Sequence, residues 1–352
     1  MTATRRLGSP AAAVPVAFLA ANALSYALLL VAAHVLSASD YGLLSSLLSL
    51  LLISGIPMMA LQTVTARRAA ARDRHDAMPQ GTLQVAAIAT VLGCALTPAV
   101  VVFLHLPGYL GILLVVATIP ANAVLGTAMG SAQGRREFTR LSILILAAIG
   151  GRSLGGLVGL LIGRSPDSTL VGVLAGTGVA AAAVVAGRHG LTWTHALHAG
   201  RNGGGVLVET MHASHAHGAF LLLTSLDVLL ARHVLSSADA GIYAAGAVVT
   251  RATLWLPQSV IMILFASLAA ADTHHAAARR AAQIVVAVGA LCVAGAAVLG
   301  PLIVTVVGGS KYHALDHRVW LYALLGALLA LLQLALLAGL AQRNPRRAAL
   351  IW

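Results

Sequence analysis

The chain has 352 residues, of which 59% are hydrophobic and 9% are charged, and its formal net charge is +12. A soluble domain has about half apolar and about a quarter charged residues, so this composition excludes an ordinary soluble protein. The apolar runs are too long for the strands of a membrane barrel and do not alternate in polarity, so helices are expected.

The long hydrophobic segments predict ten membrane-spanning helices and therefore an all-α polytopic membrane protein. A helix needs about 20 apolar residues to cross the bilayer core, and each segment supplies a run of roughly that length. The predicted spans cover approximately residues 13–36, 42–66, 83–104, 109–130, 141–163, 169–187, 216–235, 241–270, 282–304 and 318–341.

The basic residues are distributed unevenly about these spans. With the N-terminus in the cytoplasm, sixteen of the 22 Lys and Arg residues fall in cytoplasmic segments and three in external loops. The other three, Arg152, Arg232 and Arg251, fall within spans. This asymmetry follows the positive-inside rule, so the positive charge sets the topology and does not indicate a nucleic-acid partner.

The first two spans carry amide side chains among their apolar residues. Asn22 lies in the first span and Gln62 in the second. Because an unpaired amide is costly to expose to lipid, we expect both side chains to line a polar cavity. Pro57 lies within the second span and is expected to bend that helix, since it lacks a backbone N–H.

Arg152 lies near the middle of the fifth span, among five glycines (Gly150, Gly151, Gly155, Gly156 and Gly159). An arginine at the bilayer centre costs about 2.5–3.5 kcal/mol on insertion scales, so we expect it to face a wet cavity or a partner. The glycines favour close packing of helices. No strand precedes them, so they do not indicate a nucleotide-binding loop.

Residues 188–215 form the longest polar stretch and predict a cytoplasmic linker between an N-terminal lobe (1–187) and a C-terminal lobe (216–352). The histidines in or beside it match no zinc pattern, so neither a metal nor another cofactor is expected. They are His189, His195, His198, His212, His215 and His217. Cys94 and Cys292 fall within spans and are expected to serve in packing.

An internal repeat relates the two predicted lobes. Residues 34–42 read HVLSASDYG and residues 233–241 read HVLSSADAG, at an offset of 199. Each copy lies between two hydrophobic segments, which indicates two related halves, a common plan among transporters. Because the second half has four predicted spans and the first has six, we expect the natural chain to continue beyond Trp352.

Asp227 and Arg251 lie at equal distances along the chain from Asp239, which falls in the turn between the seventh and eighth spans. In two antiparallel helices this places them at the same depth. They can form a buried ion pair, or Arg251 can face a cavity while Asp227 tunes its charge or carries a coupling proton. Arg232 is close enough to the external turn for its charged end to reach the membrane surface.

Four stretches resemble the oligosaccharide flippase (Wzx-type polysaccharide transporter) family of the multidrug/oligosaccharidyl-lipid/polysaccharide exporter (MOP) superfamily. They are SYALLLVAAHVLSASDYG (25–42), QGRREF (133–138), LDVLLARHVLSSADAGIYAAG (226–246) and LWLPQSVIMILF (254–265). The chain departs from the family in two respects. The family usually continues for at least two more helices, and it commonly has a proline at the position of Ala266.

The resemblance implies a V-shaped, MATE-like bundle of two six-helix lobes around a central cavity. It also implies an exporter, not an enzyme, that flips polyprenyl-pyrophosphate-linked sugars across the cytoplasmic membrane. The partners that it implies are membrane lipid and the polysaccharide glycosyltransferases or polymerase. A single lysine, Lys311, among 22 basic residues is typical of a GC-rich genome and points to a bacterium. Arg152, Arg251 and Arg232 are the expected cationic groups for the pyrophosphate.

Two alternatives remain open at this point. A drug or metabolite antiporter of the same superfamily would bind cations and favour an acidic or aromatic cavity, whereas aromatic residues make up 4% of this chain and Asp227 is the one carboxylate in the predicted spans. A membrane-embedded glycosyltransferase would need carboxylates or a metal near the reacting groups, and the short first external loop offers a single acid, Asp40.

Overall fold

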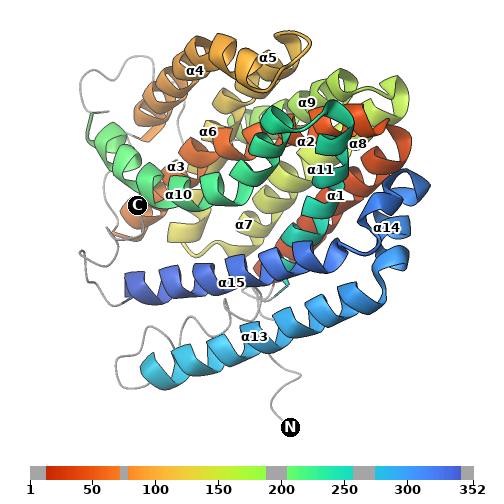
Figure 1. Cartoon of the computed structure of the whole chain (residues 1–352). Helices are drawn as coiled ribbons and strands as arrows, with labels where there is room; N and C mark the ends of the chain where they lie inside the picture. Colours follow the sequence, from red (N-terminus) through yellow and green to blue (C-terminus); the bar gives the residue numbers. More distant parts are fainter. Residues whose placement is uncertain (1–12, 72–77, 188–203, 257–273, 342–352) are drawn as a thin grey trace. The chain divides into compact units, whose positions relative to one another are not determined.

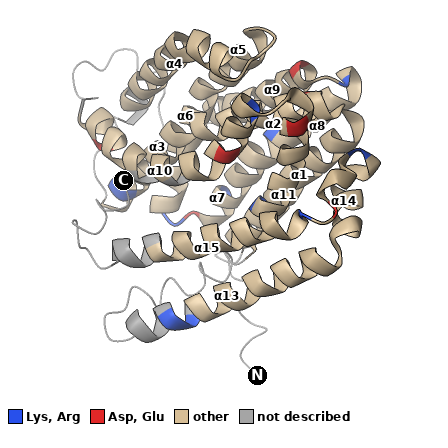
Figure 2. Cartoon of the chain, in the orientation of Figure 1, with Lys and Arg blue, Asp and Glu red and all other residues tan. Residues whose placement is uncertain are grey.

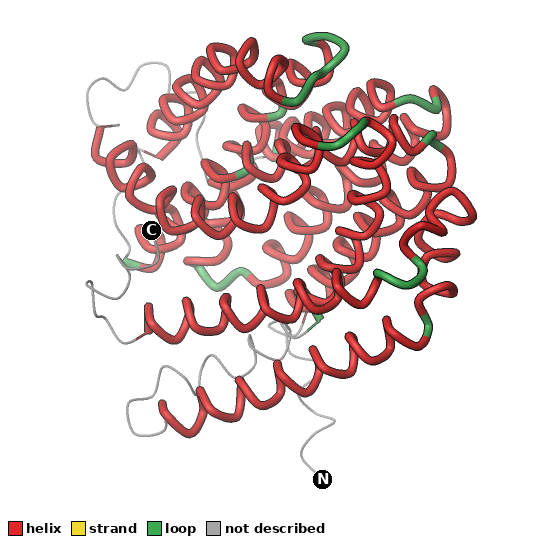
Figure 3. The backbone as a smooth tube through the Cα atoms, in the orientation of Figure 1, coloured by secondary structure: helices red, strands yellow, loops and turns green. Residues whose placement is uncertain are grey.

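The computed structural model describes residues 13–71, 78–187, 204–256 and 274–341, and these are helical apart from short connections (Figure 1). No strand occurs among the described residues (Figure 3). The predicted all-α fold class is therefore confirmed. The chain divides into two compact units, the first ending at Leu235 and the second beginning at Ser236, and each is described by itself.

The first unit contains ten α-helices and one π-helical turn among its described residues. They are α1 (Ala13–Val35), α2 (Ala38–Ser54), α3 (Ile56–Ala70), α4 (Met78–Phe103), α5 (Leu110–Ala117), α6 (Ile119–Gly134), α7 (Phe138–Ile145), the π-turn η3 (Leu146–Gly150), α8 (Gly151–Gly163), α9 (Pro166–Ala186) and α10 (Gly204–Val234).

Six helical stretches in the described residues are long and apolar enough to cross a membrane, and they coincide with the first six predicted spans. They are Ala13–Val35, Ala38–Ala70, Gly81–Phe103, Leu110–Gly134, Phe138–Gly163 and Pro166–Ala186. Large apolar side chains such as Val102 and Ile162 are exposed on them, as lipid-facing residues are. Charged residues are sparse along the helices (Figure 2).

The second and fourth spans are each interrupted at a proline. α2 ends at Ser54 and α3 begins at Ile56, with Pro57 in the first turn of α3, so the two helices meet just before the proline at which the sequence predicts a bend. Pro120 lies in the same position in α6, directly after α5. The two interrupted spans pack closely, because Gly126 on α6 leaves no room for a side chain against the backbone of Met58 on α3.

The helix α10 begins at Gly204, so residues 204–215, predicted as part of a linker, are helical. This segment is ordered by packing on the first unit: Val206 is fully buried, and a Cβ on Gly81 of α4 would lie 2.5 Å from its side chain. α10 packs on α2, α3 and α4 and falls in the first compact unit, whereas the predicted C-terminal lobe begins at residue 216.

The described part of the second unit contains α11 (Ser237–Trp255), α13 (His274–Val298), α14 (Gly300–Gly308), the 3₁₀ turn η6 (Gly309–Leu315) and α15 (Val319–Ala341). α15 packs against both α11 and α13. The hydroxyl of Thr250 on α11 donates a hydrogen bond to the carbonyl of Tyr322 on α15 (2.9 Å), and the Tyr243 and Tyr322 rings meet edge to face.

The structure corrects the ninth predicted span. The sequence predicts a single span over residues 282–304, but the chain bends by 88° between Val298 and Gly300. Pro301 cannot donate a backbone hydrogen bond to continue the helix. A Cβ on Gly300 would lie 2.1 Å from the carbonyl oxygen of Asp316, so the bend also depends on a close backbone contact. Counting this bent pair as one span gives up to seven candidates among the described residues.

The internal repeat appears as the same local geometry in both units. Ser37 caps α2: its hydroxyl donates to Asp40 Oδ2 (2.7 Å) and accepts from the Asp40 amide (3.1 Å). Ser236 caps α11 in the same way, with distances of 2.6 Å to Asp239 Oδ2 and 3.2 Å from the Asp239 amide. A serine and an aspartate three residues apart thus begin corresponding helices.

Candidate functional site

The candidate site is the segment around Arg152 in the first unit, where the fifth span changes its winding. The π-turn η3 ends at Gly150, and Arg152 is the second residue of α8. Single π-turns inside helices frequently mark functional sites, because the extra residue re-aims the side chains that follow. The winding change therefore sets the direction of the residues just after Gly150.

Arg152 is half-buried within an apolar span. No side chain or carbonyl among the described residues forms a hydrogen bond or an ion pair with its guanidinium. An arginine cannot lose its charge to escape this position. The guanidinium thus retains hydrogen-bonding capacity for an anion or for water.

The backbone beside Arg152 is fixed on one side by α1. The hydroxyl oxygens of Ser25 on α1 and Ser153 on α8 lie 2.8 Å apart, which joins the two helices directly after Arg152. Ser153 is buried. One turn further on, the Leu28 side chain occupies the space beside Gly156.

On the other side, α8 packs against α9 along a seam of glycines. A Cβ added to Gly155 would lie 2.2 Å from the carbonyl oxygen of Gly172, and one added to Gly176 would lie 3.2 Å from the Cα of Arg152. Only glycine permits backbones to approach this closely. The seam and the Ser25–Ser153 contact together hold the backbone of Arg152 between α1 and α9.

The two predicted amide positions already have partners. Asn22 Nδ2 donates to the carbonyl of Phe18 on its own helix (2.8 Å). Gln62 Nε2 donates to Gln133 Oε1 (3.0 Å), across the contact between α3 and α6. Neither side chain is brought into contact with Arg152 by a described hydrogen bond, and their role in a cavity stays a prediction.

Arg232 lies at the end of α10 and is only 7% exposed. Its Nε donates to the carbonyl of Leu104 (3.3 Å), just beyond the C-terminus of α4. The next residue, His233, stacks on the ring of Phe103 with centroids 4.2 Å apart, and its Nδ1 lies 2.7 Å from the Phe103 carbonyl. These contacts attach the end of α10 to the end of α4, as basic side chains do at helix C-termini.

Asp227 and Arg251 lie in different units, on α10 and α11. Both are half-buried, and each takes part in at least one polar or electrostatic contact. Their mutual pairing and the cavity-facing role of Arg251 stay predictions.

The histidine-rich stretch is described only in part. His212 and His215 are exposed on α10. His189, His195 and His198 lie outside the described residues, as does the side chain of His217. Among the residues that the structure describes, no group of three metal-binding side chains is found.

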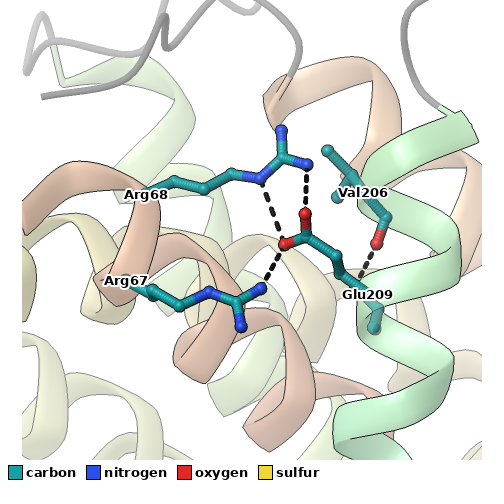
Figure 4. A network of polar contacts seen from close by, with 5 residues as sticks. Arg67, Arg68, Val206 and Glu209 are labelled. Carbon is teal, nitrogen blue, oxygen red and sulfur yellow. Dashed lines mark hydrogen bonds and ion pairs between the residues drawn. The ribbon is translucent and has the colours of Figure 1, made fainter. Parts of the chain in front are cut away.

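A polar cluster that the sequence did not reveal lies at the other end of α10 (Figure 4). Glu209 accepts hydrogen bonds from Arg68 Nη2 (2.9 Å), Arg68 Nε (3.3 Å) and Arg67 Nη2 (2.5 Å). The Arg68 guanidinium holds the pKa of the Glu209 carboxyl below its usual range. Because 141 residues separate Glu209 from Arg68, no local pattern signals the contact.

A cavity of about 170 Å³ lies between α2, the loop before α5, and α9. It is lined mainly by leucine and glycine, together with the carboxylate of Asp167 in the first turn of α9. A lone carboxylate suits a cation better than an anion, so this cavity is distinct in its chemistry from the Arg152 segment.

No family model matches the sequence, and no curated protein matches it. Among solved structures, the chain is similar to an inward-facing multidrug resistance MATE family transporter of the MOP superfamily. The TM-score is 0.65, with 12% identity over 91% of this chain and 79% of that chain. A MOP superfamily transporter from Pyrococcus furiosus Vc1 aligns with a TM-score of 0.44, with 12% identity over 95% of this chain and 84% of that chain. The chain therefore has a MATE-like transporter fold, with several helices long and apolar enough to cross a membrane.

Proposed function

We propose that this chain is a membrane exporter that flips a polyprenyl-pyrophosphate-linked oligosaccharide across the cytoplasmic membrane. The observation that carries the proposal is Arg152: a half-buried arginine in an apolar span, held by two neighbouring helices and bonded to no described residue. The fold it shares with a MOP superfamily transporter supports an export role.

The physical argument concerns the cost of moving a pyrophosphate through hydrocarbon. An ionised phosphate in an apolar medium is strongly destabilised unless charged donors surround it. A guanidinium offers several donors in a fixed plane and pairs with phosphate oxygens through two parallel hydrogen bonds. Arg152 supplies such a group within a span, while the isoprenoid tail remains in lipid.

The proposed flippase function also implies the partners and the location of the chain. The substrate is a polyprenyl-linked sugar, the surrounding partner is membrane lipid, and the enzymes that supply and use the sugar are polysaccharide glycosyltransferases or a polymerase. The basic residues favour the bacterial cytoplasmic membrane with the N-terminus inside. No enzymatic step is assigned to the chain itself.

A second candidate is a cation-coupled drug or metabolite antiporter. The similarity to a multidrug resistance MATE transporter favours it, and the cavity beside Asp167 gives a carboxylate that suits a cation. We place it second, because the fifth span, which contains the π-turn, carries the guanidinium of Arg152 and has no carboxylate.

The two functions are separated by one paired assay. The purified chain is reconstituted into liposomes that contain either a fluorescent polyprenyl-diphosphate oligosaccharide or a fluorescent lipophilic cation under a pH gradient. Movement of the lipid-linked sugar to the opposite leaflet, above that in empty liposomes, supports the flippase. Movement of the cation alone supports the antiporter and contradicts our proposal.

A further inference from the structure

The Arg67–Arg68–Glu209 cluster joins two parts of the first unit that are far apart in the sequence. Arg67 and Arg68 lie in the last turn of α3, and Glu209 lies in the second turn of α10. Figure 4 shows both guanidinium groups directed toward the same carboxylate. The charge distribution predicts that this end of α3 lies at the cytoplasmic surface of the membrane.

The hydrogen bonds in this cluster use both oxygens of one carboxylate. Oε1 accepts from Arg68, and Oε2 accepts from both Arg68 and Arg67. Two guanidinium groups converging on a small set of anionic oxygens is also the arrangement that recognises a phosphate. Glu209 thus occupies the position that a phosphate group would take between the two arginines.

The charges within the cluster do not balance. Two arginines face a single carboxylate, and no other acidic side chain of the described residues is ion-paired to either arginine. The cluster keeps a net charge of about +1, so it still attracts an anion after Glu209 is bound.

The cluster is also accessible. The Arg67 side chain is 67% exposed and Glu209 is 34% exposed, whereas Arg68 is 17% exposed. Gly205, one turn before Glu209, has no side chain to cover Arg68: a Cβ there would lie 3.5 Å from Arg68 Nη2. An incoming anion can therefore reach Arg67 first and then displace Glu209 from Arg68.

We propose that Arg67 and Arg68 form a phosphate-binding site at the cytoplasmic end of α3, and that Glu209 is its internal competitor. The ligand class is a phosphate monoester, diester or pyrophosphate at the membrane surface. Two sources carry this chemistry: the headgroup of an anionic phospholipid, and the pyrophosphate of a lipid-linked substrate. The first source is independent of the transport function proposed above, and the second rests on it.

The proposal predicts that removing the competing charge strengthens anion binding. Glu209→Gln keeps the size of the side chain but removes its charge. The matched control is Glu137→Gln, which makes the same change in the Glu137–Arg140 ion pair (2.9 Å) at the start of α7. Arg67→Gln together with Arg68→Gln removes the proposed site.

Binding is measured on the full chain in two arms. In the first arm, the chain is held in nanodiscs of phosphatidylcholine with increasing phosphatidylglycerol, and retained phosphatidylglycerol is counted by mass spectrometry. In the second arm, inorganic pyrophosphate is titrated into the chain in detergent with phosphatidylcholine. We expect Glu209→Gln to raise the affinity about tenfold in at least one arm, and the double arginine variant to abolish that binding.

The arm that responds identifies the source of the phosphate. Equal affinities for Glu209→Gln and Glu137→Gln in both arms would overturn the proposal. If Glu209→Gln does not fold, Arg68→Gln in the otherwise unchanged chain provides the second test, since it must lower binding relative to the parent. If the chain binds the anion in either arm but does not flip the lipid-linked sugar, the phosphate-binding site is supported and the proposed transport function is not.

Discussion

The hydroxyl oxygens of Ser25 and Ser153 lie 2.8 Å apart and join α1 to α8 at the residue that follows Arg152. Both serines also lie within hydrogen-bonding distance of a carbonyl one turn earlier on their own helix. The contact therefore fixes the rotation of α8 about its axis, and with it the direction in which Arg152 leaves the helix.

Replacing Ser153 with alanine should weaken this attachment without changing the charge of the site. Hydrogen bonds between membrane helices contribute about 0.6 kcal/mol on average, so we expect a small loss of thermal stability and a measurable loss of transport. Ser142→Ala is the matched control, because among the described residues the Ser142 hydroxyl bonds only within α7, to the carbonyl of Phe138. A transport rate for Ser153→Ala equal to that of Ser142→Ala would show that the interhelical contact does not position Arg152.

The glycine seam between α8 and α9 should tolerate no side chain at its centre. A Cβ on Gly172 would lie 2.0 Å from the carbonyl oxygen of Gly155, so Gly172→Ala must separate the two helices. We expect a loss of about 1–3 kcal/mol in the free energy of unfolding, measured in detergent by denaturant titration.

Gly178 provides the control on the same helix. Outside the backbone of its own helix, no atom of the described residues lies within 4 Å of a Cβ added there, and alanine favours a helix more than glycine does. Gly178→Ala should therefore be neutral or slightly stabilising. Equal losses at positions 172 and 178 would contradict the close packing of α8 on α9.

The contact between Glu209 and the two arginines should depend on pH in a defined direction. The hydrogen bond from Arg68 lowers the pKa of Glu209 in the folded chain below its usual 4.5. A lowered pKa means that the stabilisation is fully present above the unfolded-state pKa and is lost as the pH falls through the folded-state pKa.

The measurement compares the melting temperatures of the parent chain and Glu209→Gln between about pH 7 and about pH 3. The parent should be the more stable at the higher pH, and the difference should shrink on acidification. A difference that stays constant over this range would mean that the ion pair does not contribute to stability.

Much of the first unit could be predicted from the sequence, because its signals are local. Hydrophobic length alone placed the first six spans, and α2 and α3 meet at Gly55, two residues before the proline at which a bend was predicted. The repeat at residues 34–42 and 233–241 indicated two related segments, and the caps at Ser37 and Ser236 within it have the same geometry.

The features that the sequence did not reveal depend on contacts between distant residues. The bend at Gly300 rests on a close approach to the carbonyl of Asp316, which no hydropathy window detects. The π-turn before Arg152 consists of ordinary apolar residues and has no sequence signal that distinguishes it from an α-helix. The helical start of α10 depends in part on Val206 packing against Gly81, so a stretch that looks polar in isolation is helical in the fold.

The candidate site was predictable in part for the same reason. A charge within an apolar span is visible in the sequence, so Arg152 could be singled out. The sequence did not show that Arg232 donates to Leu104, or that Gln62 donates to Gln133, because each partner is distant in the sequence.

The central claim is that Arg152 carries the anionic part of a lipid-linked substrate, and transport by charge variants tests it most directly. Flipping of a fluorescent polyprenyl-diphosphate oligosaccharide is compared in liposomes for the parent, Arg152→Gln, Arg152→Lys and the control Arg318→Gln, whose arginine is exposed directly before α15. At equal reconstituted amounts, we expect Arg152→Gln to lose at least about tenfold in rate, Arg152→Lys to retain part of it, and Arg318→Gln to match the parent. Transport by Arg152→Gln at the parent rate would contradict the account.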